Sequence, residues 1–217
     1  MLQLRHCHFF SVCDGHGHNG QDVSGLLKHR LPFNIESGLK TALQGETGYP
    51  SPDVMSTVFL KAFEQSNKEV YSMVSDVRFS GSTCVSVLTY GRKIYCPNVG
   101  DSRAIMIRAN PGNPSTCTAI ALSRDHKPDD KDENAVILAN NGRVDSYRDQ
   151  LGNQIGPMRV WLKHEDIPGL AMSRSFGDST AARVGVNAVP EIKVFDMTPD
   201  DKIIVLASDG VWEFLEN

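Results

Sequence analysis

The side chains best suited to chemistry in this chain occur in two stretches that share one pattern. Residues 9–13 run into Asp14, residues 203–208 run into Asp209, and a glycine follows each aspartate. An apolar run of this kind is typical of a buried strand, and glycine permits a sharp turn where the strand leaves its sheet. Each aspartate is therefore expected at a strand end, with its carboxylate pointing beyond the sheet.

These residues have the chemistry of a divalent-cation site. Two carboxylates that face each other across a sheet repel unless a cation joins them, and Mg²⁺ and Mn²⁺ prefer oxygen ligands. Gly15 has no side chain to block its carbonyl, and His16 is of the type that exchanges a proton near neutral pH. A single Asp-Gly marks an ordinary turn more often than a metal site. It is the combination of two such units, one followed by histidine, that predicts a metal site.

Further acidic residues lie between these two units. Asp125 follows a strand-like segment at 117–122, as Asp14 and Asp209 follow theirs. The acidic run at 129–133 is explained by the start of a helix, where the helix dipole favours negative charge.

Composition limits the class of protein. The 217 residues are 40% hydrophobic and 22% charged, as in one ordinary globular domain, and we expect a single domain over residues 1–217. The net charge of −4 argues against broad nucleic-acid binding. No apolar run could span a bilayer, and residues 1–6 lack the apolar core of a signal peptide. We expect a monomer in the cytoplasm or nucleus, with no nucleic-acid or membrane partner.

The cysteines indicate neither a disulfide framework nor a zinc site. There are five, and no Cys-x-x-Cys occurs. We expect reduced thiols that pack as small hydrophobic side chains.

The hydrophobic pattern predicts an alternation of helices and strands. Pro32 is expected to end a first helix, residues 38–52 are rich in turn residues, and Ser51 is a good N-cap for a long second helix. Residues 143–170 read as a long irregular loop, which in a compact domain is usually functional. The predicted helices are 21–31, 53–75 and 129–140, with another from 211; the strands are 82–90, 94–99 and 103–108, which form a β-meander, then 117–122 and 189–197.

With these motifs and predicted elements the chain resembles a known family, the metal-dependent protein phosphatases, also called type 2C serine/threonine phosphatases. Eight ordered stretches carry the resemblance, and together they extend over nearly the whole chain. Residues 159–162 and 168–174 look most like plant and protist members. The matching stretches are 12–17, 81–83, 98–104, 125–128, 142–144, 170–178, 189–191 and 206–212.

The resemblance implies a fold of the α+β class, a four-layer α-β-β-α sandwich of two antiparallel sheets flanked by helices. It also implies a site for two Mg²⁺ or Mn²⁺ ions at one end of the sandwich. Asp14 would bridge both ions, the Gly15 carbonyl would bind one, and Asp209 would bind the other. Asp125 matches a position that helps to hold a third, weaker ion, and residues 143–170 would form the flap beside the site.

The implied reaction agrees with these residue types. Phosphate monoesters hydrolyse extremely slowly unaided, and two cations roughly 4 Å apart can turn a bridging water into hydroxide. His16 matches the general acid that protonates the leaving serine or threonine oxygen. The substrates implied are phosphoproteins, and no nucleophilic cysteine is needed. Asp101 and Asp178 are expected to have structural or supporting roles.

The chain also departs from the family pattern at both ends. Members usually begin with a strand that carries an Arg for the phosphate and a Glu-Asp pair for metal, whereas residues 1–8 contain only Arg5 and no acid. Members usually end with an Asp-Asn element, and the chain stops at Asn217 before one occurs. The domain is therefore expected to be incomplete at both termini. The alternative to an active phosphatase is an impaired fragment or pseudophosphatase that binds proteins; a hydrolase of small phosphates is a third possibility, which the motif order disfavours.

Overall fold

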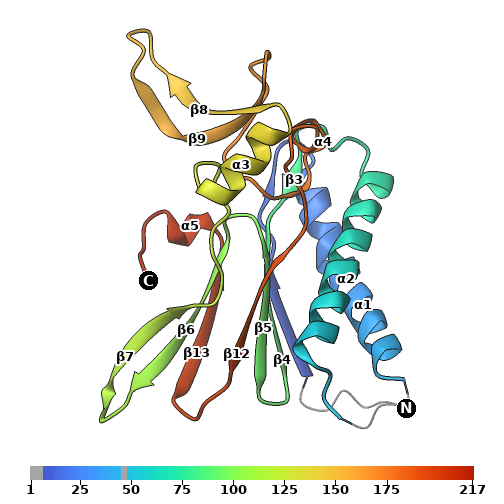
Figure 1. Ribbon diagram of the computed structural model, residues 1–217, viewed down its shortest axis with the longest axis vertical. Helices are drawn as coiled ribbons and strands as arrows, with labels where there is room; N and C mark the ends of the chain where they lie inside the picture. Colours follow the sequence, from blue (N-terminus) through green and yellow to red (C-terminus); the bar gives the residue numbers. More distant parts are fainter. Residues whose placement is uncertain (1–6, 45–47) are drawn as a thin grey trace.

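The structure, a computed structural model, describes residues 7–44 and 48–217 and contains two antiparallel sheets that face each other (Figure 1). Apolar side chains from both sheets pack between them, among them Val85, Met106 and Leu206. The expected α+β sandwich of two antiparallel sheets is confirmed. The first sheet has the order β1-β4-β5-β12, with β1 at Cys7–Val12, β4 at Cys84–Tyr90, β5 at Lys93–Val99 and β12 at Glu191–Asp196. The second has the order β13-β6-β7, with β13 at Asp201–Ala207, β6 at Arg103–Asn110 and β7 at Asn113–Ala121.

Two long helices, α1 at Gly20–Ala42 and α2 at Pro52–Met73, cover the outer face of the first sheet (Figure 1). As expected, Ser51 caps α2, and its Oγ accepts a hydrogen bond from the Val54 N–H at 3.3 Å. Among the described residues no long helix covers the outer face of the second sheet, so they form three of the four expected layers. The side chains that hold the helices to the sheet include Leu27, Leu31, Ile35, Leu39, Met55, Phe59 and Phe63.

Helix α1 continues past Pro32, where the sequence predicted its end. Ile35 and Leu39 extend the buried stripe of the helix beyond the proline. The packing of this stripe outweighs the backbone hydrogen bond that proline cannot donate. The turns expected over residues 38–52 therefore begin only after Ala42, and residues 45–47 of that stretch lie outside the described part of the chain.

The meander predicted over residues 82–108 is wrong. Strands β4 and β5 pair, but β6 belongs to the other sheet. Residues 100–102 form a buried crossover between the sheets, in which Gly100, with φ 99°, packs against Thr83. Because β5 and β6 bury side chains on both faces, their sequences do not reveal that they lie in different sheets.

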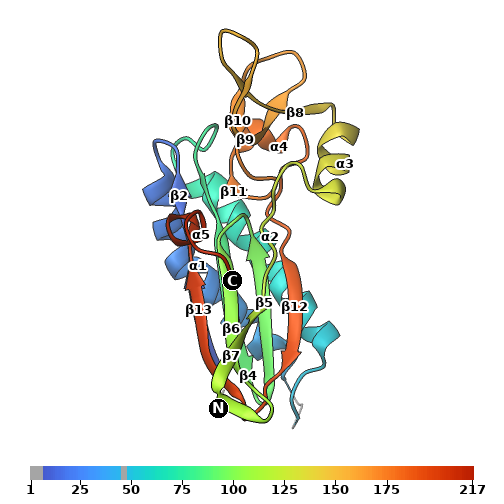
Figure 2. The same cartoon turned by 90° about the vertical axis from the view of Figure 1, so that its left-hand side faces the viewer.

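Residues 143–170, expected to be an irregular loop, instead belong to a three-stranded antiparallel sheet beyond one end of the sandwich (Figures 1 and 2). Gly152, with φ 84°, lies between the first two strands, and Gly156, with φ 71°, lies inside the second. Because glycine is typical of turns and loops, these two residues led the sequence analysis to predict a loop in place of the strands. The strands are β8 at Gly142–Arg148, β9 at Gln154–Leu162 and β10 at Pro168–Leu170, in the order β10-β9-β8.

This sheet has a hydrophobic cluster of its own. Ile137 of helix α3 (Lys131–Ala139), Val160 of β9 and Ala181 of helix α4 (Ser179–Ala182) are buried together in it. The cluster shares no residue with the clusters of the sandwich.

In the described residues no helix is both long and apolar enough to cross a membrane. The absence of a signal peptide in residues 1–6 stays a prediction, since those residues lie outside the described ranges.

Candidate functional site

Asp14 and Asp209 lie close together. The elements beside them, β2 (Gly15–His16) and α5 (Asp209–Trp212), lie at the end of the sandwich that faces the β8–β10 sheet (Figure 2). Asp14 follows β1, and Asp209 is the first residue of the short helix α5 at Asp209–Trp212. Burial, then the nearby Asp209 carboxylate and then Asp101 raise the pKa of the Asp14 carboxyl above its usual range. Like charges held together in this way favour a bound cation.

The backbone on both sides of this pair is fixed by hydrogen bonds. The Asp14 N–H donates to Thr83 Oγ1 at 3.0 Å, and the Thr83 N–H donates to the Asp14 carbonyl at 2.9 Å. The Trp212 indole donates to the carbonyls of Ala207 and Arg103 at 2.8 and 3.0 Å, which ties α5 to the ends of β13 and β6.

The donor set fits a hard divalent cation. Mg²⁺ is commonly held by one or two carboxylates, with water and substrate phosphate completing its shell, and Asp14 and Asp209 supply two. Within residues 7–44 and 48–217 no group of three or more His, Cys, Asp and Glu side chains is arranged to hold a metal. The Gly15 backbone packs tightly against Gly20 at the start of α1.

Asp125 is bound to an arginine in this structure. The Arg103 guanidinium donates from Nε to Asp125 Oδ1 at 2.9 Å and from Nη2 to Oδ2 at 2.8 Å. This bidentate ion pair occupies both carboxylate oxygens. Asp101 is buried, and its Oδ2 accepts from Lys127 Nζ at 2.5 Å.

His16 lies beside Asp14 and is bound to Asp178. The Nε2–Oδ2 distance is 2.6 Å, and Asp178 is buried. Burial alone would lower the pKa of His16, but the hydrogen bond to Asp178 and the surrounding carboxylates outweigh it and raise the pKa. Nδ1 is buried and has no hydrogen-bond partner in the described part of the chain.

A small three-stranded sheet positions this pair. It has the order β11-β3-β2, with β2 at Gly15–His16, β3 at Gly81–Ser82 and β11 at Phe176–Gly177. His16 pairs with Gly81 across β2 and β3, and Asp178 follows β11 directly. Asp178 has a left-handed backbone, with φ 44°, and its N–H donates to the Ser80 carbonyl at 3.0 Å.

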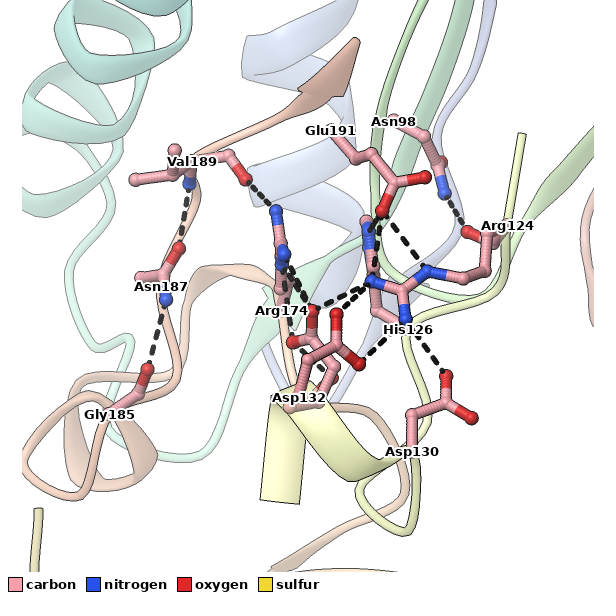
Figure 3. A network of polar contacts seen from close by, with 12 residues as sticks. Asn98, Arg124, His126, Asp130, Asp132, Arg174, Gly185, Asn187, Val189 and Glu191 are labelled. Carbon is pink, nitrogen blue, oxygen red and sulfur yellow. Dashed lines mark hydrogen bonds and ion pairs between the residues drawn. The ribbon is translucent and has the colours of Figure 1, made fainter. Parts of the chain in front are cut away.

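A network of charged groups joins the end of the sandwich to helix α3 (Figure 3). The buried Glu133 carboxylate of α3 accepts from Arg174 at 2.6 Å, from Ser173 Oγ at 2.8 Å and from Arg124 at 3.2 Å. Arg124 also forms ion pairs with Asp132 at 2.8 Å and Glu191 at 2.9 Å. The segment that carries Asp125 is therefore held on one side by α3 and on the other by β12.

His126 links the same segment to the crossover between the sheets. The His126 side chain is fully buried. The backbone N–H of His126 donates to the Gly100 carbonyl at 3.0 Å, and the ring Nδ1 accepts from the Gly100 N–H at 3.1 Å. These two hydrogen bonds, with the Lys127–Asp101 ion pair, join the loops that carry Asp101 and Asp125. Neither the contacts of His126 nor those of Glu133 have a local signal in the sequence, which explains the acidic run at 129–133 by the helix dipole alone.

The structure thus brings Asp14, Asp209 and His16 to one place, whereas the Asp125 carboxylate is bound to Arg103. The sequence predicted a structural or supporting role for Asp178, but it did not predict the contact between Asp178 and His16. No pattern in the sequence pairs these two residues, which are far apart along the chain.

Comparison with known proteins identifies the family of the chain. Residues 3–217 match the family model described as "Protein phosphatase 2C". The chain is 38% identical over 208 residues to "Probable protein phosphatase 2C 72" of Arabidopsis thaliana, covering 95% of this chain and 61% of that protein. It is 36% identical over 208 residues to "Probable protein phosphatase 2C 64" of Oryza sativa subsp. japonica, covering 95% and 46%. The chain therefore spans only about half to three fifths of these relatives.

A solved structure shares the fold. A serine-threonine phosphatase 2C from Toxoplasma gondii superposes with a TM-score of 0.79 at 21% sequence identity, over 97% of this chain and 70% of that one. From the family match, the plant relatives and the sandwich with its acidic end, we conclude that this chain belongs to the protein phosphatase 2C family.

Proposed function

We propose that this chain carries the catalytic core of a metal-dependent phosphatase that hydrolyses phosphoserine and phosphothreonine in proteins. The observation that carries the proposal is the position of the His16–Asp178 pair beside the facing carboxylates of Asp14 and Asp209. Family membership supports the same reaction. The curated relatives are longer than this chain, so the activity is proposed for the part of the protein that carries these residues.

Asp14 and Asp209 would hold Mg²⁺ or Mn²⁺. When bound, two such cations supply an acidified water as nucleophile and neutralise the phosphoryl oxygens. The Gly15 carbonyl is proposed as a further ligand. Asp125 is proposed for a third, weaker ion, which would have to compete with Arg103 for the carboxylate.

His16 would supply the proton that the leaving alkoxide needs. Its Nε2 is engaged by Asp178, and its other nitrogen, Nδ1, is buried without a hydrogen-bond partner in the described residues, so a substrate would have to expose Nδ1 to receive its proton. Asp178 would fix the ring orientation and stabilise the charged imidazolium. The carboxylates of Asp14 and Asp101 also favour the protonated form of the ring.

One observation favours a second candidate, a protein-binding module without catalysis. Within the described residues the acidic end has no cluster of three or more metal-ligating side chains, and Asp125 is neutralised by Arg103. A domain of this kind would keep the sandwich and bind partners through its surface.

Hydrolysis of p-nitrophenyl phosphate separates the two candidates. The chain is assayed with Mn²⁺, with Mg²⁺ and with EDTA, alongside Asp209→Asn and the control Asp196→Asn, an exposed residue paired with Lys93 on β5. A phosphatase gives turnover that EDTA and Asp209→Asn abolish and Asp196→Asn preserves. A chain that is folded by circular dichroism and shows no metal-dependent turnover would favour the binding module.

A further inference from the structure

Cys13 and Cys84 face each other where β1 approaches the acidic end of the sandwich. The last pair of the β1–β4 ladder is Val12 with Val85, and the next backbone bond joins Thr83 N–H to the Asp14 carbonyl at 2.9 Å. Continuing this register places Cys13 opposite Cys84, between two hydrogen-bonded pairs. Positions of that kind have Cα atoms about 4.5 Å apart, within the range of about 4.4–6.8 Å found in disulfides.

The two thiols also lie on the same face of the sheet and close to each other. Both pack into the cluster beneath α1 and α2. The proximity of Cys13, together with burial, raises the pKa of the Cys84 thiol well above its usual value. Cys84 is fully buried, whereas Cys13 is partly exposed, so Cys13 is the residue of the pair that solvent reaches.

The other three cysteines lack this arrangement. Cys7 faces Tyr90 across β1 and β4, Cys96 points to the opposite face of the sheet, and Cys117 is exposed on β7. One pair of thiols out of five is therefore placed to be joined.

We propose that Cys13 and Cys84 form a reversible disulfide on exposure to hydrogen peroxide, and that this bond switches off the site at Asp14. The Cys13 sulfur attacks one peroxide oxygen, the O–O bond breaks, and a sulfenic acid and one water result. The Cys84 sulfur then attacks the Cys13 sulfur, the S–O bond breaks, and the hydroxyl leaves with the Cys84 proton as a second water. A thiol pair reverses the reaction. Disulfides of reduced compartments are usually transient ones of this kind.

The bond would act on the site through the backbone. Cys13 directly precedes Asp14, and Cys84 directly follows Thr83. The hydroxyl and the backbone N–H of Thr83 are hydrogen-bonded to the backbone of Asp14, and Thr83 Oγ1 is also 2.7 Å from Ser102 Oγ. Drawing the two sulfurs into a covalent bond shifts the strand ends that carry these groups. A displacement of ~1 Å at a catalytic group costs roughly a hundred-fold in rate. This second part of the proposal rests on the proposed phosphatase function.

Peptide mapping tests the bond independently of activity. The Cys7→Ser/Cys117→Ser variant keeps three cysteines, which trypsin places on separate peptides: Cys13 in residues 6–28, Cys84 in 79–92 and Cys96 in 94–103. After peroxide and alkylation of free thiols, we expect a linked 6–28/79–92 peptide that dithiothreitol separates. Cys84→Ser is the matched control, in which Cys13 is oxidised without forming a link.

Turnover and Mn²⁺ binding are measured on the same samples. We expect peroxide to lower the metal-dependent turnover of the Cys7→Ser/Cys117→Ser variant by roughly a hundred-fold. We also expect it to weaken Mn²⁺ binding, measured by electron paramagnetic resonance. Dithiothreitol should restore both turnover and Mn²⁺ binding. Peroxide that leaves the 6–28 and 79–92 peptides unlinked overturns the proposal. A linked protein with unchanged Mn²⁺ binding and turnover overturns the switch. If the reduced protein shows no turnover, that result argues against the phosphatase function. The linked peptide then still tests whether the disulfide forms, and Mn²⁺ binding still tests whether the disulfide alters the site.

Discussion

Gly81 lies directly opposite His16, and a Cβ atom at Gly81 would overlap the Asp178 carboxylate that the imidazole binds. The same atom would also overlap the Phe176 carbonyl and lie 2.7 Å from Ser175 Oγ. The absence of a side chain at this position is therefore what allows the His16–Asp178 pair to form.

Gly81→Ala is expected to separate this pair while the sandwich still folds. Overpacking of this size costs about 1–3 kcal/mol, and we expect the turnover of a phosphoserine peptide to fall by roughly ten- to a hundred-fold. Turnover and thermal unfolding are measured together. Gly25→Ala in α1 is the control, because a Cβ atom there meets no other group and should stabilise the helix by about 0.5–1 kcal/mol. Unchanged turnover in Gly81→Ala would contradict the role given to the pair.

Asp178→Asn removes the charge beside His16 and keeps the shape, since asparagine tolerates the left-handed backbone at this position. If Asp178 supports a general acid, the loss depends on the leaving group. We expect turnover of a phosphoserine peptide to fall by roughly 10²-fold or more, and that of p-nitrophenyl phosphate, whose phenolate leaves without a proton, to fall far less. Asp149→Asn, in the exposed turn between β8 and β9, is the control. Equal losses on both substrates would show that Asp178 has only a structural role.

Glu133→Gln is expected to destabilise the protein through the network of Figure 3. The Glu133 and Arg174 side chains are 6% and 19% exposed, so the change leaves a guanidinium without its buried carboxylate. Breaking such a pair costs about 3–5 kcal/mol. Asp132→Asn tests the neighbouring exposed partner of Arg124, and at 63% exposure it should cost about 1 kcal/mol or less. Urea unfolding of both variants measures the difference, and similar losses would contradict the assignment of Glu133 as the central residue.

Acid should weaken the fold through Glu69 and Glu191. Arg30, with Gln65 and Asn34, lowers the pKa of Glu69 from 4.5 to about 2, and His126 and Arg124 do the same for Glu191. A depressed folded-state pKa gives stability that is present above the unfolded value and lost as the pH falls through the folded value. The loss therefore falls between about pH 4.5 and pH 2.

Urea unfolding at pH 7 and pH 3 measures this loss. Glu69→Gln should reduce the difference between the two values, since its charge no longer contributes at pH 7. Glu36→Gln, an exposed pair partner on α1, should leave it unchanged. An identical pH dependence in all three proteins would rule out Glu69 as a source of acid sensitivity.

The sequence predicted the features that have a local signal. The runs that end at Asp14 and Asp209 are strands, and Ser51 caps its helix. Family motifs then supplied the sandwich, which composition and periodicity alone could not.

The features that the sequence missed depend on contacts between distant segments. Pro32 lies inside α1 because the buried apolar side chains of that helix continue beyond the proline. Strand β6 lies in the second sheet because residues 100–102, whose sequence is typical of a hairpin turn, form a crossover between the sheets. The His16–Asp178 and Glu133–Arg174 contacts join residues that only the fold brings together.

The separate hydrophobic cluster beneath β8–β10 has a consequence for how this protein can diverge. Because that cluster shares no residue with those of the sandwich, substitutions in the strands above it leave the packing that holds Asp14 and Asp209 untouched. The β8–β10 sheet and the acidic end of the sandwich can therefore accept substitutions independently of each other.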